Sequence, residues 1–139
     1  MFMDDRDKKI IEILRMDSRL PIREIAKKTL MRSSTVYQRI KRLKEDAIIE
    51  KFTIKVNDTK IGEDFIVFML VKTKPTVQLE LLNNSHVKEA FGVTGEYDLL
   101  LKLKFKGVSE FNSFIISFRK DARIVSTLTM VGTAKIKED

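Results

Sequence analysis

The polar side chains best suited to bind a polyanion lie in one basic stretch, residues 33–44. It offers hydroxyls, an amide and cations, carried by Ser33, Ser34, Thr35, Gln38, Arg39, Lys41 and Arg42. Cations bind phosphates, and glutamine or arginine can form paired hydrogen bonds to base edges in the major groove of DNA. The same composition also suits a solvated basic helix on a protein surface. The rest of the chain must decide between these two interpretations.

Other kinds of functional chemistry find little support. The sequence contains no cysteine and one histidine, His86, which lies in a polar stretch beside residues 83–85. A glycine-rich phosphate loop and an HExxH pair are both missing from the sequence, and these are the usual signatures of nucleotide and metal sites. We therefore predict that the protein is not an enzyme, holds no cofactor and binds no metal.

Apolar spacing places the basic stretch on a helix. Val36, Ile40 and Leu43 recur at positions i, i+4 and i+7, so they share one helix face. At about 100° per residue, Gln38 and Lys41 then point the opposite way. The two serines at the start of the stretch occupy the place of an N-cap. The pattern predicts a helix with one buried side and one polar, basic side.

Two shorter helices are predicted before the basic one. Asp4 or Asp5 can cap the first, whose buried side is rich in isoleucine. Pro21 is placed to begin the second, because proline is tolerated in the first helical turn. Residues 29–32 then connect to the basic helix. Two short helices joined by a short turn, the second basic on its outer side, are typical of a helix-turn-helix.

After the basic helix the pattern changes its period. Apolar and polar residues alternate from 48 to 56, which predicts a half-buried strand or a two-stranded wing. Lys51 and Lys55 would project from this wing towards phosphates. Asn57, Asp58 and Gly62 mark a turn and a linker. We therefore expect a winged helix-turn-helix domain over residues 1–62.

Positive charge is concentrated in this first domain. Residues 1–62 hold 16 lysines and arginines against 10 acidic residues, a net charge of +6. Residues 63–139 hold 11 against 10, which leaves +1 of the total of +7. The imbalance favours a polyanionic partner for the first domain only, although a chance imbalance on a soluble protein would look the same.

The second half of the chain has the pattern of a small mixed domain. Strands are predicted over 65–71, 87–93, 99–105 and 124–133, with helices over 76–82 and after Ser109, which would cap the second helix. The order βαββαβ is that of a ferredoxin-like split unit with both helices on one sheet face. We expect this domain to span residues 63–139.

One sheet face should therefore lack a helical cover. The strand at 65–71 is apolar at every position, so both of its faces need covering. An exposed apolar sheet face usually marks a partner surface, and we predict a homodimer formed sheet to sheet. A dimer would also present two basic helices to half-sites about one helical turn of DNA apart. Alternatively, the first domain or aromatic side chains cover this face within one chain.

Bulk properties place the chain among cytoplasmic proteins. No apolar run approaches the roughly 18 residues that span a bilayer, so no membrane partner is expected. The charged start of the sequence is unlike a signal peptide. The lack of cysteine fits a cytoplasmic location.

Both halves together resemble the Lrp/AsnC (leucine-responsive regulatory protein/asparagine regulator) family of prokaryotic transcription regulators, from Asp4 to about Lys137. The matching segments, in their order and spacing, are residues 7–11, 25–26, 39–43, 48–53 and 94–99. The resemblance implies an α+β protein: an N-terminal winged helix-turn-helix that reads DNA, followed by a βαββαβ ferredoxin-like domain for effector binding and dimerisation. It also implies dimers that often associate into octamers.

The resemblance further implies an effector, commonly an amino acid, bound between dimers. The residues that match this site are Thr94, Gly95, Glu96, Tyr97 and Asp98, with Thr127 and Thr129 on the last strand. The glycine amide could meet a carboxylate and the aspartate an ammonium group. A plain hairpin turn, stabilised by the aspartate, is the alternative.

Departures from the family pattern concern mainly turns. The family usually has glycine in the helix-turn-helix turn and after the basic helix, where this chain has Leu30 and Ala47. If either position requires a positive φ, a side chain with a Cβ costs roughly 1 kcal/mol or more. The Pro-Gly that the family has before the last strand is replaced by residues 122–123, and the first helix of the second domain is about a turn short.

Two other functions remain open on the sequence alone. The first is RNA binding by the sheet, although the segment 102–105 lacks the Gly-Phe-rich signature of such sheets. The second is an architectural DNA-binding protein that works without an effector. Sequence preference in DNA binding would favour the regulator, and uniform, steeply salt-dependent binding the architectural protein.

Overall fold

The computed structural model describes residues 2–75 and 79–139, and the chain forms two compact units. We call Met1–Lys55 the helical unit and Val56–Asp139 the sheet unit. Within the described residues, no helix has the length and apolar character needed to cross a membrane.

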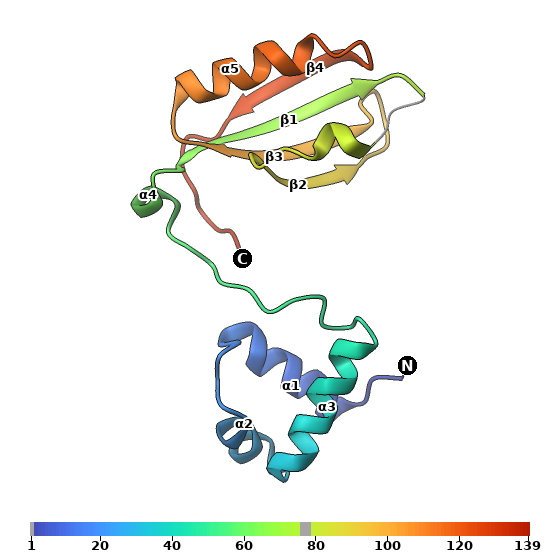
Figure 1. Ribbon diagram of the computed structural model, residues 1–139, viewed down its shortest axis with the longest axis vertical. Coiled ribbons are helices and arrows are strands. Elements are labelled where there is room, and N and C mark those ends of the chain that lie inside the picture. The colour runs from blue at the N-terminus through green and yellow to red at the C-terminus, as the bar shows by residue number, and fades with distance from the viewer. Residues whose placement is uncertain (1, 76–78) are drawn as a thin grey trace. The chain divides into compact units, whose positions relative to one another are not determined.

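The helical unit is a bundle of three helices. These are α1 (Asp5–Met16), α2 (Ile22–Thr29) and α3 (Ser33–Glu45), which surround one buried cluster (Figure 1). The cluster consists of Ile10, Ile25, Ala26, Val36 and Leu43. Each helix therefore buries the apolar stripe that its sequence period predicted, and the helix-turn-helix is confirmed.

The ends of α1 and α2 follow their local sequence. Asp4 caps α1, and its carboxylate accepts a hydrogen bond from the backbone N–H of Asp7 while the Asp7 carboxylate accepts one from the backbone N–H of Asp4. This is a capping box, which satisfies N–H groups that the first turn leaves free. Pro21 is the residue before α2, as expected.

Two non-glycine residues with positive φ end α2 and follow α3. Leu30 caps the C-terminus of α2 at φ 54° and ψ 38°, and Ala47 has a φ of 56°. These are the two positions at which the family usually has glycine. The left-handed region strains residues with a Cβ. Both turns therefore have the left-handed backbone that glycine would adopt, although Leu30 and Ala47 carry a side chain that is strained in it.

The sheet unit consists of a four-stranded antiparallel sheet and the helices connected to it. Its elements are α4 (Asp58–Ile61), β1 (Phe65–Thr73), the 3-10 turn η1 (Leu79–Leu82), β2 (Val87–Gly92), β3 (Leu99–Phe105), α5 (Val108–Arg119) and β4 (Ile124–Val131). The strand order is β2-β3-β1-β4, which confirms the ferredoxin-like arrangement of four strands.

One face of the sheet is covered by α5 and η1. Alternate residues of β1 and β3 point to it and are fully buried, among them Val67, Met69, Leu101 and Leu103. The α5 helix contributes Ile115 and Phe118 to the same core. Figure 1 shows α5 and η1 on the same side of the strands. This burial is the main source of stability for the unit.

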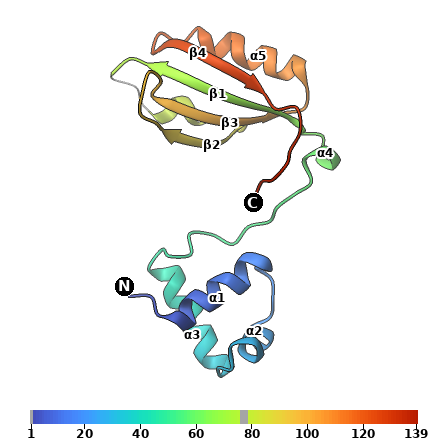
Figure 2. The same cartoon turned by 180° about the vertical axis from the view of Figure 1, so that it is seen from behind.

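The opposite face, which we call the outer face, has no helix over it among the described residues (Figure 2). Its apolar part is formed by large side chains that remain 37–58% exposed: Phe68, Phe91, Leu128 and Met130. The predicted uncovered apolar face is therefore present within this unit, because β1 alternates apolar residues towards both sides.

The other part of the outer face carries an ion-pair network. We call this set the lysine network: Lys102 and Lys104 of β3, Lys135 and Glu138 of the C-terminal segment, Asp58 of α4 and Glu89 of β2. Asp58 is only 5% exposed and accepts from Lys104 at 2.9 Å and from Lys135. These contacts attach Asp58 of α4 to β3 and to the C-terminal segment. The sheet unit begins at Val56, whereas the sequence placed the domain boundary after residue 62.

Three predictions on local structure need correction. The wing over residues 48–56 does not form; residues 50–57 have no regular secondary structure, and the side chain of Ile54 is 75% exposed. A strand needs a partner strand for its backbone groups, and the part of the chain that the structure describes offers none. Of the predicted helix at 76–82, the described part is the 3-10 turn η1 and not an α-helix, and residues 76–78 lie outside the described residues. Finally, α5 begins at Val108 after Gly107, not after Ser109.

Candidate nucleic-acid interface and effector turn

The α3 helix begins one residue earlier than its hydroxyls suggested. Arg32 is the N-cap, with extended backbone and no side-chain capping bond, and its carbonyl accepts the first helical hydrogen bond from Val36 N–H. Ser33 and Ser34 are therefore the first two residues of the helix rather than its cap. Their hydroxyls lie at the exposed start of α3, which is where recognition helices place base-contacting groups.

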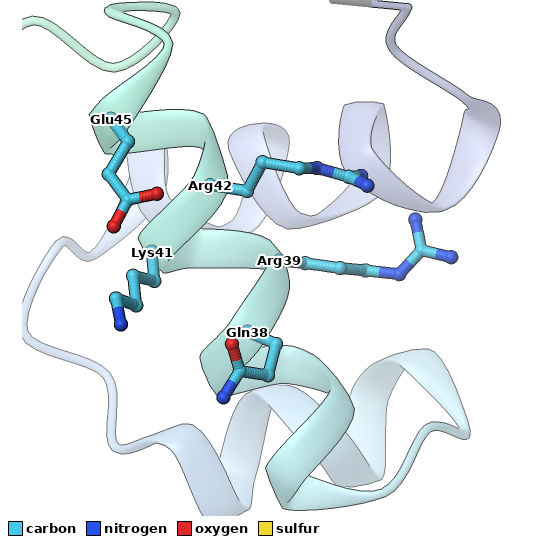
Figure 3. Close-up of a pocket in the computed structure, with 5 residues that line it drawn as sticks. All are labelled: Gln38, Arg39, Lys41, Arg42 and Glu45. Atoms are coloured by element: carbon cyan, nitrogen blue, oxygen red, sulfur yellow. The ribbon is translucent and has the colours of Figure 1, made fainter.

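The predicted DNA-binding residues do not all have the same surroundings. Exposed positions are Ser33, Ser34, Gln38, Lys41, Arg42, Lys51 and Lys55, while Thr35 and Arg39 are partly buried. Five side chains line a shallow hollow on α3: Gln38, Arg39, Lys41, Arg42 and Glu45. Figure 3 shows Arg39 and Arg42 extending to one side of α3, with Lys41 and Glu45 on the other.

Arg39 is bound to the first turn of α1. Its Nη1 atom lies 2.8 Å from both carboxylate oxygens of Asp4 and 2.9 Å from Oδ1 of Asp7. The Arg39 side chain is 20% exposed and that of Asp7 is completely buried. We call Asp4 and Asp7 the acid clamp. The capping box of α1 thus also fixes the middle of α3.

Arg42 contacts the same clamp more loosely. Its Nη2 atom lies 3.3 Å from Oδ2 of Asp7, and its side chain is 50% exposed. Sequence reasoning missed this pairing, although two aspartates three residues apart, at the N-cap and in the first turn of α1, were a visible signal. The spacing identified a helix start, but not the partners of the carboxylates 35 residues away.

Hydrogen bonding shifts the pKa values of Asp4 and Arg39 in opposite directions. Hydrogen bonds from the Arg39 guanidinium and from the backbone N–H of Asp7 lower the pKa of Asp4 to about 2. The same contacts, first with Asp4 and then with Asp7, raise the pKa of Arg39 above its usual value. The charged pair is therefore maintained at all physiological pH values.

The segment after α3 folds back onto the helical unit. Lys44 donates to the backbone oxygen of Glu50, and its ammonium group lies 5.9 Å from the centre of the Phe52 ring. Ser18 donates to the carbonyl of Thr53 at 3.3 Å. Lys51 and Lys55 therefore extend from an irregular segment beside α3, and not from a wing.

The predicted effector turn joins β2 to β3. Thr94, Gly95, Glu96 and Asp98 are exposed, and Tyr97 is partly buried. Gly95 has a φ of 112°, a conformation that side chains with a Cβ rarely adopt.

Asp98 is occupied by the neighbouring strand. Its Oδ2 atom accepts from the backbone N–H of Thr73 at 2.8 Å and from the Thr73 hydroxyl at 3.1 Å. Asp98 therefore has a structural role, which the sequence had left open as an alternative to effector binding. Its carboxylate stabilises the end of β1 rather than its own turn.

The two threonines of the last strand lie on the face covered by α5. Thr127 pairs with Val71 and Thr129 with Met69, both across β1. The Oγ1 atom of Thr129 is buried and has no hydrogen-bond partner within the described residues. Thr127 lies near the end of the sheet where Asp98 meets Thr73, and Thr129 lies further along β4.

The RNA-binding alternative is weakened by the lysine network. Lys102 and Lys104 are 15% and 11% exposed, and both donate to Glu138. Cations engaged in this way are not available to a phosphate backbone.

Comparison with known proteins identifies similar sequences over nearly the whole chain. Residues 3–44 match the family described as AsnC-type helix-turn-helix domain, and residues 66–139 match the Lrp/AsnC ligand binding domain. The chain is 38% identical over 140 residues to the HTH-type transcriptional regulator FL11 of Pyrococcus furiosus, an alignment that covers 98% of this chain and 93% of that protein. The Pyrococcus abyssi protein of the same name is 35% identical with the same coverage.

Solved structures with the same fold include Escherichia coli AsnC. It has a TM-score of 0.89 and 23% identity, and the match covers 100% of this chain and 97% of that one. A transcriptional regulator from Neisseria meningitidis, solved in complex with L-methionine, has a TM-score of 0.89 and 19% identity, with coverage of 99% and 94%. At these identities the likeness concerns the fold.

Proposed function

Because this chain belongs to the Lrp/AsnC family of transcription regulators, we propose that it regulates transcription by binding double-stranded DNA through the exposed face of α3. The observation that carries this proposal is a helix-turn-helix whose last helix presents Gln38, Lys41 and Arg42 to solvent. Its relatives are described as regulators rather than enzymes, and we propose neither catalysis nor a bound cofactor for this chain. DNA as the partner favours a cytoplasmic location.

The roles of the side chains follow from their chemistry. Lys41 and Arg42 are suited to phosphate oxygens, and Lys51 and Lys55 extend the same positive surface. Gln38 can form paired hydrogen bonds to adenine, and the hydroxyls at residues 33–35 can reach base edges or phosphates. Together these groups would give a sequence-specific contact with one half-site.

We further propose that the protein acts as a homodimer whose sheets meet at their outer faces. The support is the row of half-exposed apolar side chains on that face, since exposed patches of this kind usually bind a partner. Association of dimers into an octamer is common in the family. Sedimentation of the full chain at micromolar concentration tests this proposal, and a monomer under those conditions would contradict it.

An amino acid is the effector that we propose for the turn at residues 94–98. The family match over residues 66–139 is to a ligand-binding domain, and the Neisseria regulator holds L-methionine. The open backbone at Gly95 could receive a carboxylate. Thermal-shift measurements with each of the twenty amino acids test the proposal, and the absence of any shift would contradict it.

A salt-titrated gel shift tests DNA binding itself. The duplex is first selected from a random pool by the wild-type protein, and a scrambled duplex of the same composition is the control. A regulator prefers the selected duplex at every salt concentration, whereas an architectural protein binds both equally and loses affinity steeply with salt. Lys41→Ala should weaken binding to the selected duplex without unfolding the chain.

A further inference from the structure

Two arginines on α3 share one buried carboxylate but differ in how firmly they hold it. Arg39 makes three contacts of 2.8–2.9 Å with Asp4 and Asp7, and its side chain is 20% exposed. Arg42 makes one contact of 3.3 Å with Asp7, and its side chain is 50% exposed. Both guanidinium groups extend towards α1 (Figure 3).

The loss of one arginine from the clamp leaves Asp7 with different partners, depending on which arginine is lost. A buried carboxylate is costly unless it is paired and hydrogen-bonded. If Arg42 leaves, Asp7 keeps its contact with Arg39 and its hydrogen bond from the backbone N–H of Asp4. If Arg39 leaves, Asp4 loses its guanidinium partner, and Asp7 keeps the same backbone hydrogen bond but has only the longer contact with Arg42 as a charged partner. Arg39 is therefore the firmly bound partner and Arg42 the exchangeable one.

We propose that the acid clamp gives these two arginines separate roles in the DNA binding proposed above, on which this inference rests. Arg39 is a positioning residue that stays bound to Asp4 and Asp7 and fixes the orientation of α3 relative to α1. Arg42 transfers from Asp7 to a DNA phosphate when the protein meets the duplex.

This division changes how the charge of the basic helix is counted. Lys44 is engaged with Glu50 and Phe52, and Arg39 is engaged with the clamp. Lys41 and Arg42 are then the cations of residues 38–42 that reach phosphate. Each phosphate contact releases counterions, so the salt dependence of binding counts the contacts.

The test is the salt dependence of DNA binding by the full chain. Fluorescence anisotropy with a labelled mixed-sequence duplex gives the slope of log affinity against log salt between about 50 and 200 mM KCl. Arg42→Ala should reduce the steepness of that slope by about 0.9 for each bound chain, and Lys41→Ala should do the same. Arg39→Ala should bind several-fold more weakly but with the wild-type slope. Lys9→Ala, an exposed cation on α1, is the matched control and should change neither.

Each outcome of this test is decisive. A slope reduced by Arg39→Ala as much as by Arg42→Ala would make Arg39 a phosphate contact and overturn the proposal, and so would an unchanged slope for Arg42→Ala. If Arg39→Ala does not fold, NMR spectra of the wild-type chain provide the test instead. The guanidinium resonances of Arg42 should then move on addition of the duplex while those of Arg39 stay, and the reverse overturns the proposal. A wild-type protein without salt-dependent binding would contradict the proposed function itself.

Discussion

The carboxylate of Asp98 accepts two hydrogen bonds from Thr73, one from its backbone N–H and one from its hydroxyl, across 25 residues of sequence. The contact joins the start of β3 to the end of β1. A residue proposed to bind an effector therefore already stabilises the sheet. This double role decides which substitution can test effector binding.

Asp98→Asn should separate the two roles. Asparagine keeps a carbonyl oxygen for Thr73 but loses the charge that an ammonium group would need. We expect stability within about 0.5 kcal/mol of wild type and loss of the thermal shift that an amino acid produces. Asp98→Ala should in addition cost about 1 kcal/mol, because Thr73 loses its acceptor. The control is Asp64→Asn, an exposed position before β1. A variant Asp98→Asn with the full amino-acid response would contradict the assignment.

Glycine at position 30 or 47 should stabilise the helical unit. The left-handed conformation costs a residue with a Cβ about 1–2 kcal/mol, while glycine costs about 0.5–1 kcal/mol in the unfolded chain. Relief of the left-handed strain is the larger effect. We therefore expect Leu30→Gly and Ala47→Gly each to raise the free energy of unfolding, measured by urea denaturation, by about 0.5–1 kcal/mol. The Leu30 side chain is 93% exposed, so little packing is lost.

The matched control for these substitutions is Lys28→Gly, at an exposed position inside α2. There glycine should destabilise by about 1 kcal/mol, as it does in ordinary helices. A loss of the same size at position 47 would contradict the role of the positive φ.

Acid should weaken the helical unit through Asp4. Its pKa is lowered to about 2 from a model-peptide value of 3.8, chiefly by Arg39. A lowered pKa means that the folded state binds fewer protons, so the contribution is complete above pH 3.8 and is lost as the pH falls to about 2. Asp4→Asn keeps the helix cap without the charge. The stability advantage of wild type over this variant, measured by urea midpoints, should therefore shrink between pH 4 and pH 2. An advantage that stays constant across this range would refute the linkage.

The C-terminal segment should contribute to the stability of the sheet unit through Glu138. Hydrogen bonds from Lys102 first, and from Lys104 and Lys135, lower the pKa of Glu138 to about 2 against the effect of burial. Glu138→Gln removes one of two carboxylate partners from each of two lysines that are 15% and 11% exposed, and leaves Lys102 with Glu89 and Lys104 with Asp58. We expect a loss of about 1–3 kcal/mol, seen by scanning calorimetry. Its exposed neighbour offers the control Lys137→Gln, and equal effects of the two substitutions would count against the network.

Periodicity in the sequence was enough to predict the helices of the helical unit and the four strands. Burial imposes a period of 3.6 on helices and of 2 on strands, so the stripe of Val36, Ile40 and Leu43 and the alternation from Leu99 to Phe105 identified their elements. The same signal failed at residues 48–56. Alternation indicates a side chain that prefers burial, but it does not say whether a partner strand exists.

Contacts between distant charges could not be predicted. Sequence spacing placed Arg39 on the flank of a basic helix and Asp4 at a helix start, yet their meeting depends on how α1 packs against α3. The lysine network has the same origin, since Asp58 and Lys135 are 77 residues apart. Local patterns give the sign of a surface, whereas packing decides which charges remain available to a ligand.

At the start of α1, one side chain both caps the helix and holds an arginine of another helix. Serine, threonine, asparagine and aspartate are nearly interchangeable as helix caps, so a cap position by itself tolerates any of them. At position 4 the carboxylate also holds Arg39 of α3. A change from aspartate to another cap residue there would keep the start of α1 but release Arg39 from position 4, so that a local helix-capping position also controls how α3 is held.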